Sequence, residues 1–247
     1  MTVTGKGNYA GSVSANFNIR WATYTVHFDK NHNDATGTMS DQQFTYSSSQ
    51  HLTANAFTNN GYTFHGWYTN PDGTGDFYTN GQQVNNLTPI NNETVTLYAK
   101  WNAINYNITY DLDGGSMATA NPTTYNVETP TFTLNNPTKP GYTFDGWTGT
   151  DLTEPTQTVT ITQGSTGDRS YTAQWTPNTY TVHFDANNGE GTMNDMSFTY
   201  DQAQNLTANT FTREYHNFSG WNASDNGSGT SYTDGQSVSN LDRKSVV

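Results

Sequence analysis

The segment Tyr24-Thr-Val-His-Phe-Asp29 occurs a second time, unchanged, as Tyr180-Thr-Val-His-Phe-Asp185, and a variant of it lies at Tyr106-Asn-Ile-Thr-Tyr-Asp111. Within it, apolar and aromatic side chains alternate with Thr and His. A period of two residues is typical of a half-buried β-strand. Three copies of one strand therefore mark the starts of three related units.

Other stretches follow these copies in a constant order, and each recurs in at least one other unit. In the first unit they are Gly37-Thr-Met39, Phe44-Thr-Tyr46, Leu52-Thr-Ala-Asn55, Gly61-Tyr-Thr-Phe-His-Gly-Trp67 and Val95-Thr-Leu-Tyr-Ala-Lys-Trp101. The units begin near residues 23, 105 and 179. Their spacing exceeds the roughly 20–45 residues of a solenoid repeat and suffices for a small domain with its own core. We interpret the chain as a tandem array of small domains.

The predicted boundaries divide the chain into five segments. They are 1–22, the closing strands of a preceding β repeat; 23–104, the first unit; 105–178, the second; 179–241, the third, truncated before its last strand; and 242–247. The final six residues match nothing in the repeat, and a common sequencing-adapter read translates to the same residues. We therefore predict that 242–247 is a non-native tail and that the natural protein continues. The alternative is a genuine, divergent C-terminus.

The composition predicts a mostly β chain. Aromatic residues make up 14% of it, with 16 Tyr, 12 Phe and 6 Trp, so there is ample apolar area to bury. Abundant Thr and Tyr, with little Leu, Glu or Lys, favours strands and turns over helices. Because the linkers Asn102–Asn105 and Thr176–Thr179 are short, we expect an elongated rod of domains.

One unit is predicted to contain four strands joined by turns rich in Gly, Asn and Asp. In the first unit they cover 24–28, 39–46, 61–67 and 94–101. The polar segment 47–56 holds at most one short helix or an extended crossing. In the third strand we expect Tyr62, Phe64 and Gly66 to share a face, where Gly66 lets the backbone bend or lets the Trp67 indole lie across it.

The charge of the chain excludes several kinds of partner. Nine Lys and Arg stand against 21 Asp and Glu, for a net charge of -12. This disfavours nucleic acid and anionic lipid, which bind clustered basic residues. The absence of cysteine excludes a disulfide scaffold, Cys-ligated zinc and Cys nucleophiles. We expect a monomeric segment of a larger chain.

A chain without cysteine, with few lysines and many Thr, Asn and Gly, is typical of an exported bacterial surface protein, so the predicted location is extracellular, on a bacterial cell surface or in the cell wall. No apolar stretch reaches the roughly 18 residues of a membrane span, so no membrane insertion is expected in this segment. The first residues, Met1–Gly7, lack the basic and apolar regions of a signal peptide. We therefore expect the export signal to lie outside this chain.

The motif order resembles a known family. Tyr-Thr-Val-x-Phe-Asp, Phe-Thr-Tyr, Gly-Tyr-Thr-Phe-x-Gly-Trp and Leu-Tyr-Ala-x-Trp together are similar to the Listeria–Bacteroides repeat, the internalin B-repeat-like module of bacterial surface proteins. The resemblance covers 23–101, 105–175 and 179–241 and implies small β-grasp-like domains in tandem on secreted or wall-anchored proteins. Residues 3–19 resemble the closing strands of an MBG or Ig-like repeat.

No catalytic residue and no cofactor are predicted. The chain contains neither a Gly-x-Ser-x-Gly elbow nor a His-Glu-x-x-His motif. His27 and His183 occupy the same repeat position on the Thr side of the strand, so we interpret them as exposed sheet residues.

No metal site is predicted either. Asp111-Leu-Asp113-Gly-Gly115 is similar to a calcium loop, because hard cations bind clustered oxygens, but the further acidic ligands are absent. The repeat explains it as a strand end and a turn. Asp72-Gly-Thr-Gly-Asp76 is similar, and Asn226 replaces Asp72 in the third unit.

The aromatic residues leave two interpretations open. Recurring Trp residues are either core or junction packing, which their fixed spacing favours, or platforms for sugars and partner proteins. They are Trp67, Trp147, Trp221, Trp101 and Trp175. In the loop of the first unit, Tyr68, Phe77 and Tyr78 are better candidates for exposure.

The sequence therefore predicts a non-catalytic stalk or spacer in a bacterial cell-surface or secreted protein, with possible adhesive contacts. A protein- or glycan-binding adhesin module, or an accessory array of a larger extracellular enzyme, are the alternatives.

Overall fold

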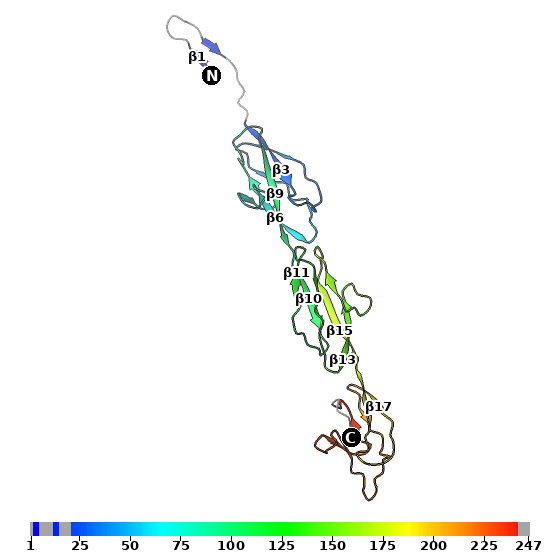
Figure 1. The fold of residues 1–247 in the computed structure, drawn as a ribbon. Coiled ribbons are helices and arrows are strands. Elements are labelled where there is room, and N and C mark those ends of the chain that lie inside the picture. Colours follow the sequence, from blue (N-terminus) through cyan, green and yellow to red (C-terminus); the bar gives the residue numbers. More distant parts are fainter. Residues whose placement is uncertain (1, 5–11, 15–20, 242–247) are drawn as a thin grey trace. The chain divides into compact units, whose positions relative to one another are not determined.

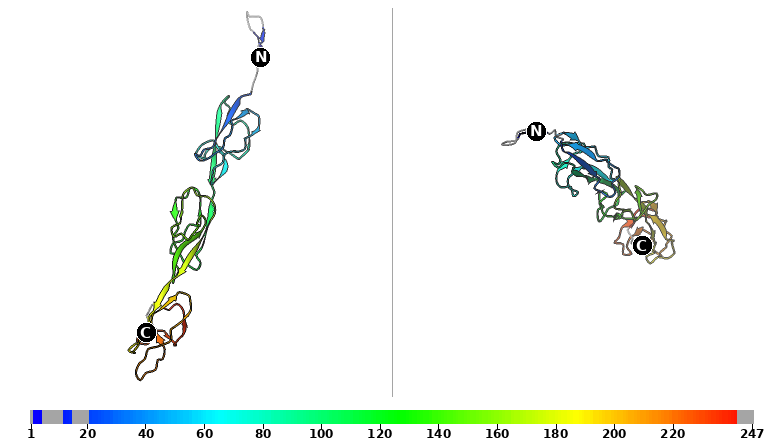
Figure 2. Two further views of the ribbon diagram at one scale, coloured as in Figure 1. Left: turned by 90° about the vertical axis from the view of Figure 1, so that its right-hand side faces the viewer. Right: turned by 90° about the horizontal axis from the view of Figure 1, so that it is seen from above.

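The computed structural model describes residues 2–4, 12–14 and 21–241. In this part of the chain every regular element is a strand or an isolated bridge, and Figures 1 and 2 show arrows and loops there without a coiled ribbon. The prediction of a mostly β chain is confirmed. Near the N-terminus, β1 (Thr2–Thr4) and β2 (Ser12–Ser14) form an antiparallel pair. The predicted tail 242–247 lies outside the described residues.

Tertiary contacts divide the described chain into two compact units. The first runs to Asn105 and includes Asn126–Glu128 and Gly164–Thr166, and the second comprises the remaining residues. Below, the three predicted units 23–104, 105–178 and 179–241 are called repeat 1, repeat 2 and repeat 3. Buried apolar side chains form three clusters, one in each repeat. Each repeat therefore has a core of its own.

Repeat 1 is built on a five-stranded sheet with the order β4-β3-β9-β6-β7. Its strands are β3 (Thr23–Asp29), β4 (Gln42–Thr45), β6 (Tyr62–Tyr68), β7 (Phe77–Tyr78) and β9 (Thr94–Ala103). The central pair, β3 and β9, is parallel, and the other neighbours are antiparallel. In the segment 47–56 lies β5 (Gln50–His51), which pairs with β8 (Gln83–Val84) and closes the open side of the core. This segment is thus an extended crossing and not a helix.

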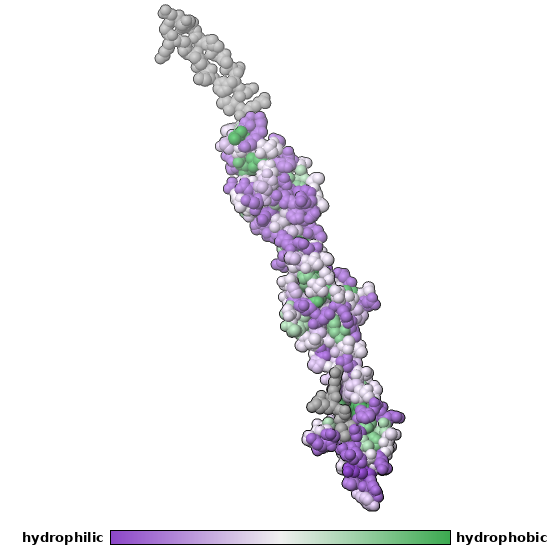
Figure 3. All heavy atoms as spheres, viewed as in Figure 1, coloured by the Kyte–Doolittle hydropathy of each residue, from purple (hydrophilic) through white to green (hydrophobic). Residues whose placement is uncertain are grey.

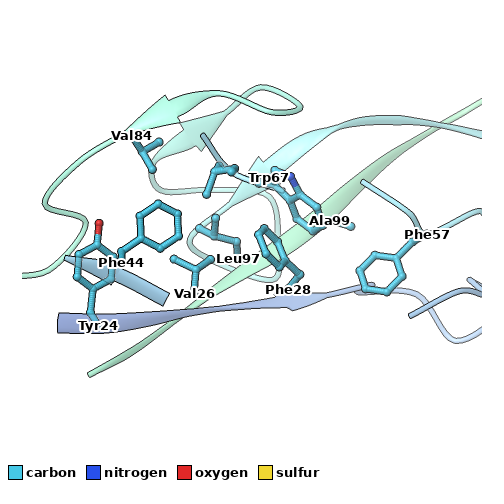
Figure 4. Close-up of a cluster of buried hydrophobic side chains, with 10 residues drawn as sticks. Tyr24, Val26, Phe28, Phe44, Phe57, Trp67, Val84, Leu97 and Ala99 are labelled. Atoms are coloured by element: carbon cyan, nitrogen blue, oxygen red, sulfur yellow. The ribbon is translucent and has the colours of Figure 1, made fainter. Parts of the chain in front are cut away.

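The inner face of this sheet carries the core of repeat 1, shown in Figure 4. Leu97 and Ala99 alternate inward from β9, and the Trp67 indole between them and Phe28 is fully buried. The Phe28 and Trp67 rings lie 4.9 Å apart in a tilted arrangement. Aromatic pairs of this kind add stability beyond the area that they bury.

A bulge at His65 decides which side chains of β6 face the core. The pairing of β6 with β9 skips this residue between Phe64 and Gly66. An extra residue reverses the alternation that follows it, so Trp67 joins Phe64 on the inner face and Gly66 lies on the outer face. The prediction that Gly66 shares a face with Tyr62 and Phe64 is therefore wrong.

Repeat 2 repeats this arrangement in a four-stranded sheet with the order β11-β10-β15-β13. The strands of repeat 2 are β10 (Tyr106–Asp111), β11 (Thr124–Tyr125), β12 (Phe132–Thr133), β13 (Tyr142–Gly149), β14 (Thr160–Ile161) and β15 (Arg169–Pro177). β10 and β15 are parallel, and β13 pairs with β15 through a bulge after Phe144, as in repeat 1. β12 and β14 form the small second sheet.

Repeat 3 has shorter strands. They are β16 (Thr179–Val182), β17 (Met196–Thr199), β18 (Gln204–Asn205), β19 (Trp221–Asn222), β20 (Ser231–Tyr232) and β21 (Ser237–Val238). The described residues of this repeat include no counterpart of β9, along which β6 forms most of its bonds in repeat 1. The third strand is therefore reduced to β19, although Trp221 remains buried beside Phe184.

The surface is mostly polar. Figure 3 shows hydrophilic and neutral colours over most of the viewed face, with green in small separate patches. The large hydrophobic side chains that are exposed in the described chain are Trp21, Phe77, Ile90, Tyr215 and Phe218. Scattered exposed apolar residues are normal, so a functional surface must be sought where they gather.

Candidate functional site

The recurring Trp side chains belong to the cores. Trp67, Trp147 and Trp221 have exposed fractions of 0%, 0% and 2%. Trp101 is partly buried and donates its indole N–H to the Lys30 carbonyl oxygen at 2.9 Å, and Trp175 donates to that of Leu112 at 3.0 Å. The core-packing interpretation is therefore right for Trp67, Trp147 and Trp221, which offer no ring face to a sugar. Trp101 and Trp175 pack against the cores with part of their surface exposed.

The repeated histidines form exposed pairs with carboxylates. Nδ1 of His27 lies 2.7 Å from Oδ1 of Asp41, and Nδ1 of His183 lies 2.6 Å from Oδ1 of Asp195. All four side chains are about half exposed. Each Asp immediately precedes the second strand of its repeat, so these are cross-strand surface contacts, which contribute little to stability. Both histidines are exposed, as predicted; His27 lies within β3, whereas His183 directly follows the end of β16.

The candidate calcium loop is a capped turn. Oδ1 of Asp111 accepts a hydrogen bond from the Asp113 backbone N–H at 2.9 Å, and Asp29 and Asp185 accept equivalent bonds at 2.7 and 2.8 Å. The carboxylate thus has the same local role in all three repeats. Among the described residues there is no group of three or more side chains suited to hold a metal ion.

The second acidic loop is also a turn. Oδ1 of Asp72 accepts hydrogen bonds from the Thr74 backbone N–H at 3.0 Å and from its hydroxyl at 2.6 Å. These bonds lower the pKa of the Asp72 carboxyl from its usual value. In repeat 3, Asn226 accepts the equivalent bond from the Ser228 N–H at 3.0 Å. A neutral amide can replace the carboxylate, so the turn does not need the charge.

An open hollow of about 500 Å³ lies beside the turn Asp29–Asp34. Two side chains in its wall are engaged by the backbone. Nζ of Lys30 donates to the Ala35 carbonyl oxygen at 2.6 Å, and Nδ2 of Asn31 donates to that of Ala99 at 3.0 Å. The hollow is the surface of a well-bonded turn, and we assign no ligand to it.

Of the three aromatic residues predicted to be exposed, two lie on the outer face of the sheet and one on the inner face. Phe77 has an exposed fraction of 41% and lies opposite Tyr68, which is half-buried, on the outer face of the β6–β7 pair. Tyr78 packs inward against the core, and burial raises the pKa of its hydroxyl. Neighbouring strand residues point to opposite faces, so the prediction is wrong for Tyr78.

Two residues that the sequence analysis did not single out complete this outer face. The His65 ring lies 5.3 Å from that of Phe77 and 6.3 Å from that of Tyr68, at interplanar angles of 30° and 17°. Tyr98 of β9 lies directly opposite Tyr68 in the sheet. The outward position of Tyr98 is predictable from the sequence, because Tyr98 alternates with the inward Leu97. The position of His65 is not, because it depends on the bulge between Phe64 and Gly66.

No helix capable of crossing a membrane occurs in the part of the chain that the structure describes. Proteins of two bacteria are among those that are similar to this chain. A protein of Evansella cellulosilytica named "Putative Gly-rich membrane protein" is 31% identical over 199 residues, which cover 80% of this chain and 22% of that protein. Internalin H of Listeria monocytogenes is 32% identical over 147 residues, which cover 56% of this chain and 24% of internalin H. The chain spans less than a quarter of the length of these relatives, and no solved structure matches it.

One family accounts for most of the chain. The family model described as the Listeria-Bacteroides repeat domain matches residues 24–100, 106–174 and 180–243. Each stretch contains one of the aromatic clusters centred on a buried Trp. The resemblance seen in the motif order is confirmed, and the chain belongs to the Listeria-Bacteroides repeat domain family.

Proposed function

We propose that this chain is a non-catalytic spacer in a bacterial cell-surface or secreted protein, where it holds other domains at a distance as an elongated rod. One observation carries the proposal: three successive family repeats each close a core of their own. Domains that are complete in themselves can be added in tandem to lengthen a chain without any new core.

The short connections between repeats support this role. Two residues separate β9 from β10, and Asn178 alone separates β15 from β16. The N–H of Ile104 donates to the Gly61 carbonyl oxygen, and the N–H of Asn178 donates to that of Gly141, both at 2.9 Å. A linker bonded to the preceding repeat has little freedom to bend, which favours a semi-rigid array.

The chemistry of the chain supports a passive role outside the cell. The candidate acidic residues are used as turn caps and the repeated histidines as surface pairs. A chain without cysteine and with a net charge of -12 is suited to a secreted, soluble array. The names of the relatives, a Gly-rich membrane protein and an internalin, are consistent with the cell surface.

Small-angle X-ray scattering of the 247-residue chain tests the spacer. A compact domain of this length has a radius of gyration of about 18 Å, and an unfolded chain about 55 Å. We expect a radius of gyration at least half as large again as the compact value, with fluorescence showing that the core tryptophans Trp67, Trp147 and Trp221 are still buried. A value near that of the compact domain contradicts the proposal. Labelling of intact cells by antibodies against the chain tests the location, and labelling only after permeabilisation contradicts it.

A second candidate function, adhesion, is favoured by one observation, the outer aromatic face of repeat 1. Nothing observed favours the third, an accessory array of an extracellular enzyme.

A further inference from the structure

An aromatic surface crosses three strands of repeat 1. By the strand register, Tyr98 of β9, Tyr68 of β6 and Phe77 of β7 form one row on the outer face. The Tyr68 and Phe77 ring centroids are 5.1 Å apart, and the ring of His65 stacks on both. We call these four residues the aromatic face.

The fold does not require aromatic residues at these positions. In repeat 2 the pair that corresponds to Tyr68 and Tyr98 is Thr148 and Thr172, in the same register. In repeat 3, Asn222 lies opposite Ser231 where repeat 1 has Tyr68 opposite Phe77. The three positions held by Tyr68, Tyr98 and Phe77 are thus occupied elsewhere in the chain by small polar residues, and the strands pair in the same register. Packing of the domain therefore does not explain the aromatic face.

The rings are held in place before any ligand arrives. Phe77 lies across Gly66, where an added Cβ would come within 2.4 Å of the ring. Gly66 directly follows the bulge and has a φ angle of +156°, a conformation that residues with a side chain rarely adopt. Nδ1 of His65 lies 3.3 Å from Nδ2 of Asn102, which fixes the tilt of the imidazole. Preorganised rings lose little entropy on binding.

Polar groups border the rings. The loop after β6 carries Asp72 and Thr74 at its exposed tip. Lys100, opposite Gly66 in the register, reaches this loop, since an added Cβ on Gly73 would lie 3.0 Å from its Nζ. Carboxylate, hydroxyl and ammonium groups at the edge of a ring platform can bond the hydroxyls of a ligand stacked on the rings.

We propose that the aromatic face binds a neutral pyranose glycan, whose flat C–H face stacks on Tyr68, Phe77 and His65 while its hydroxyls bond the loop 70–76. Stacked rings with a polar border match the two-sided character of a sugar ring. The site is independent of the spacer role, because it lies on one repeat.

Charge and size favour this occupant over two others. Asp72 lies in the loop that joins Tyr68 to Phe77, in a chain of net charge -12, and this charge repels an anionic polysaccharide. A stable protein partner buries about 800 Å² on each side, and a few partly buried rings offer much less. The ring faces match one or two sugar residues.

Binding of neutral and anionic oligosaccharides to the full chain tests the proposal. The probes are cellohexaose, chitohexaose and mannohexaose, with polygalacturonate as the anionic comparison, and the readouts are calorimetry and backbone amide chemical shifts. We expect at least one neutral hexasaccharide to bind in the millimolar range or tighter and to shift amides around His65, Tyr68, Phe77 and Tyr98. The shift map locates the site without any substitution.

The decisive variant gives repeat 1 the residues of repeat 3. His65→Ser, Tyr68→Asn and Phe77→Ser together place side chains there that the same fold already contains at Ser219, Asn222 and Ser231. We expect affinity to fall about tenfold or more, because the variant removes every ring on which the sugar stacks. The matched control is Tyr215→Asn in repeat 3, which removes a tyrosine that is 93% exposed and should leave affinity unchanged.

Three outcomes would overturn the proposal. They are no binding of any neutral probe at millimolar concentration, binding that the triple variant leaves unchanged, and amide shifts that lie away from the aromatic face. Preference for polygalacturonate would also refute it. Should the triple variant lose the dispersed spectrum of a folded domain, Tyr68→Thr alone, which copies Thr148 of repeat 2, replaces it and should still lower the affinity.

Discussion

Repeat 1 and repeat 2 share one strand register but carry different chemistry on the two faces of the sheet. On the inner face, Trp67 and Trp147 each lie opposite an alanine and both are fully buried. On the outer face, Tyr68 and Tyr98 of repeat 1 are replaced by two threonines in repeat 2. The inner face must close a core and is therefore constrained by packing. The outer face is free to vary, and differences in function between the repeats belong there.

The largest expected effect is on the shared inner face. Trp67→Ala and Trp147→Ala should each lower the free energy of unfolding of their own repeat by about 3–5 kcal/mol, because each opens a large cavity in a closed core. Hydrogen exchange, read separately for peptides of each repeat, measures the loss. Tyr215→Asn, at an exposed site, should change stability by less than about 0.5 kcal/mol. A loss below about 1 kcal/mol at either Trp would show that the indole is not a core residue.

The inner face could be predicted from sequence, and much of the outer face could not. Alternation in Tyr24–Asp29 and Thr94–Trp101 identifies the inward side chains, because an unbroken strand has a period of two residues. Gly61–Trp67 also reads as an unbroken strand, but the bulge at His65 reverses its alternation. Gly66 therefore lies on the face opposite to the one that the alternation predicts, and the alternation gives no sign that His65 joins the outer face. A bulge depends on pairing with β9, which a single strand does not reveal.

The second comparison concerns the indole nitrogen of the core Trp. Nε1 of Trp147 donates to Oδ1 of Asn136 at 3.1 Å, whereas buried Nε1 of Trp67 has no hydrogen-bond partner among the described residues. Ala56 holds the position of Asn136 in repeat 1, two residues before a bridged threonine in both repeats. Asn136→Ala should cost repeat 2 about 1–3 kcal/mol, since it leaves a buried donor unpaired.

The reverse substitution sharpens the same comparison. Ala56→Asn should raise the free energy of unfolding of repeat 1 by about 1 kcal/mol by supplying the missing acceptor. Denaturant midpoints and hydrogen exchange of the two repeats check both changes. Ala56→Ser, whose side chain is shorter than that of Asn, is the control and should gain less. If Asn136→Ala leaves the free energy of unfolding of repeat 2 unchanged, the hydrogen bond between Trp147 and Asn136 does not stabilise that repeat, and the two cores do not differ in this respect.

A third difference between the two repeats concerns their stability at alkaline pH. Repeat 2 has Tyr110 where repeat 1 has Phe28, and burial, with a smaller effect of Tyr171, raises the pKa of the Tyr110 hydroxyl to about 12. A tyrosine in an unfolded chain ionises near pH 10. Because the folded pKa is the higher one, this stabilisation is full below about pH 10 and is lost as the pH rises through about 12.

Tyr110→Phe should therefore flatten the fall in stability of repeat 2 between about pH 10 and pH 12. At neutral pH it should cost about 1 kcal/mol, because the Tyr110 hydroxyl donates to the Pro122 carbonyl oxygen at 2.9 Å. Hydrogen exchange of repeat 2, corrected for pH, measures both effects, with Tyr215→Phe as a control that should leave the profile unchanged. An alkaline profile identical to that of the unsubstituted chain would exclude Tyr110 as the cause.

The smallest effect on stability is expected where the two repeats differ most. Tyr68→Thr with Tyr98→Thr gives repeat 1 the outer face of repeat 2, and it should change the free energy of unfolding by less than about 1 kcal/mol, since both side chains keep part of their surface in solvent. The same double variant should lose most of its glycan affinity, because ring stacking supplies the binding energy. Core and surface would then respond in opposite ways: the Trp variants unfold a repeat, and the Tyr variants leave it folded without a ligand. A loss of stability as large as that of Trp67→Ala would instead show that the aromatic face is needed for folding of repeat 1. Its absence from repeat 2 would then reflect a difference in packing and not in function.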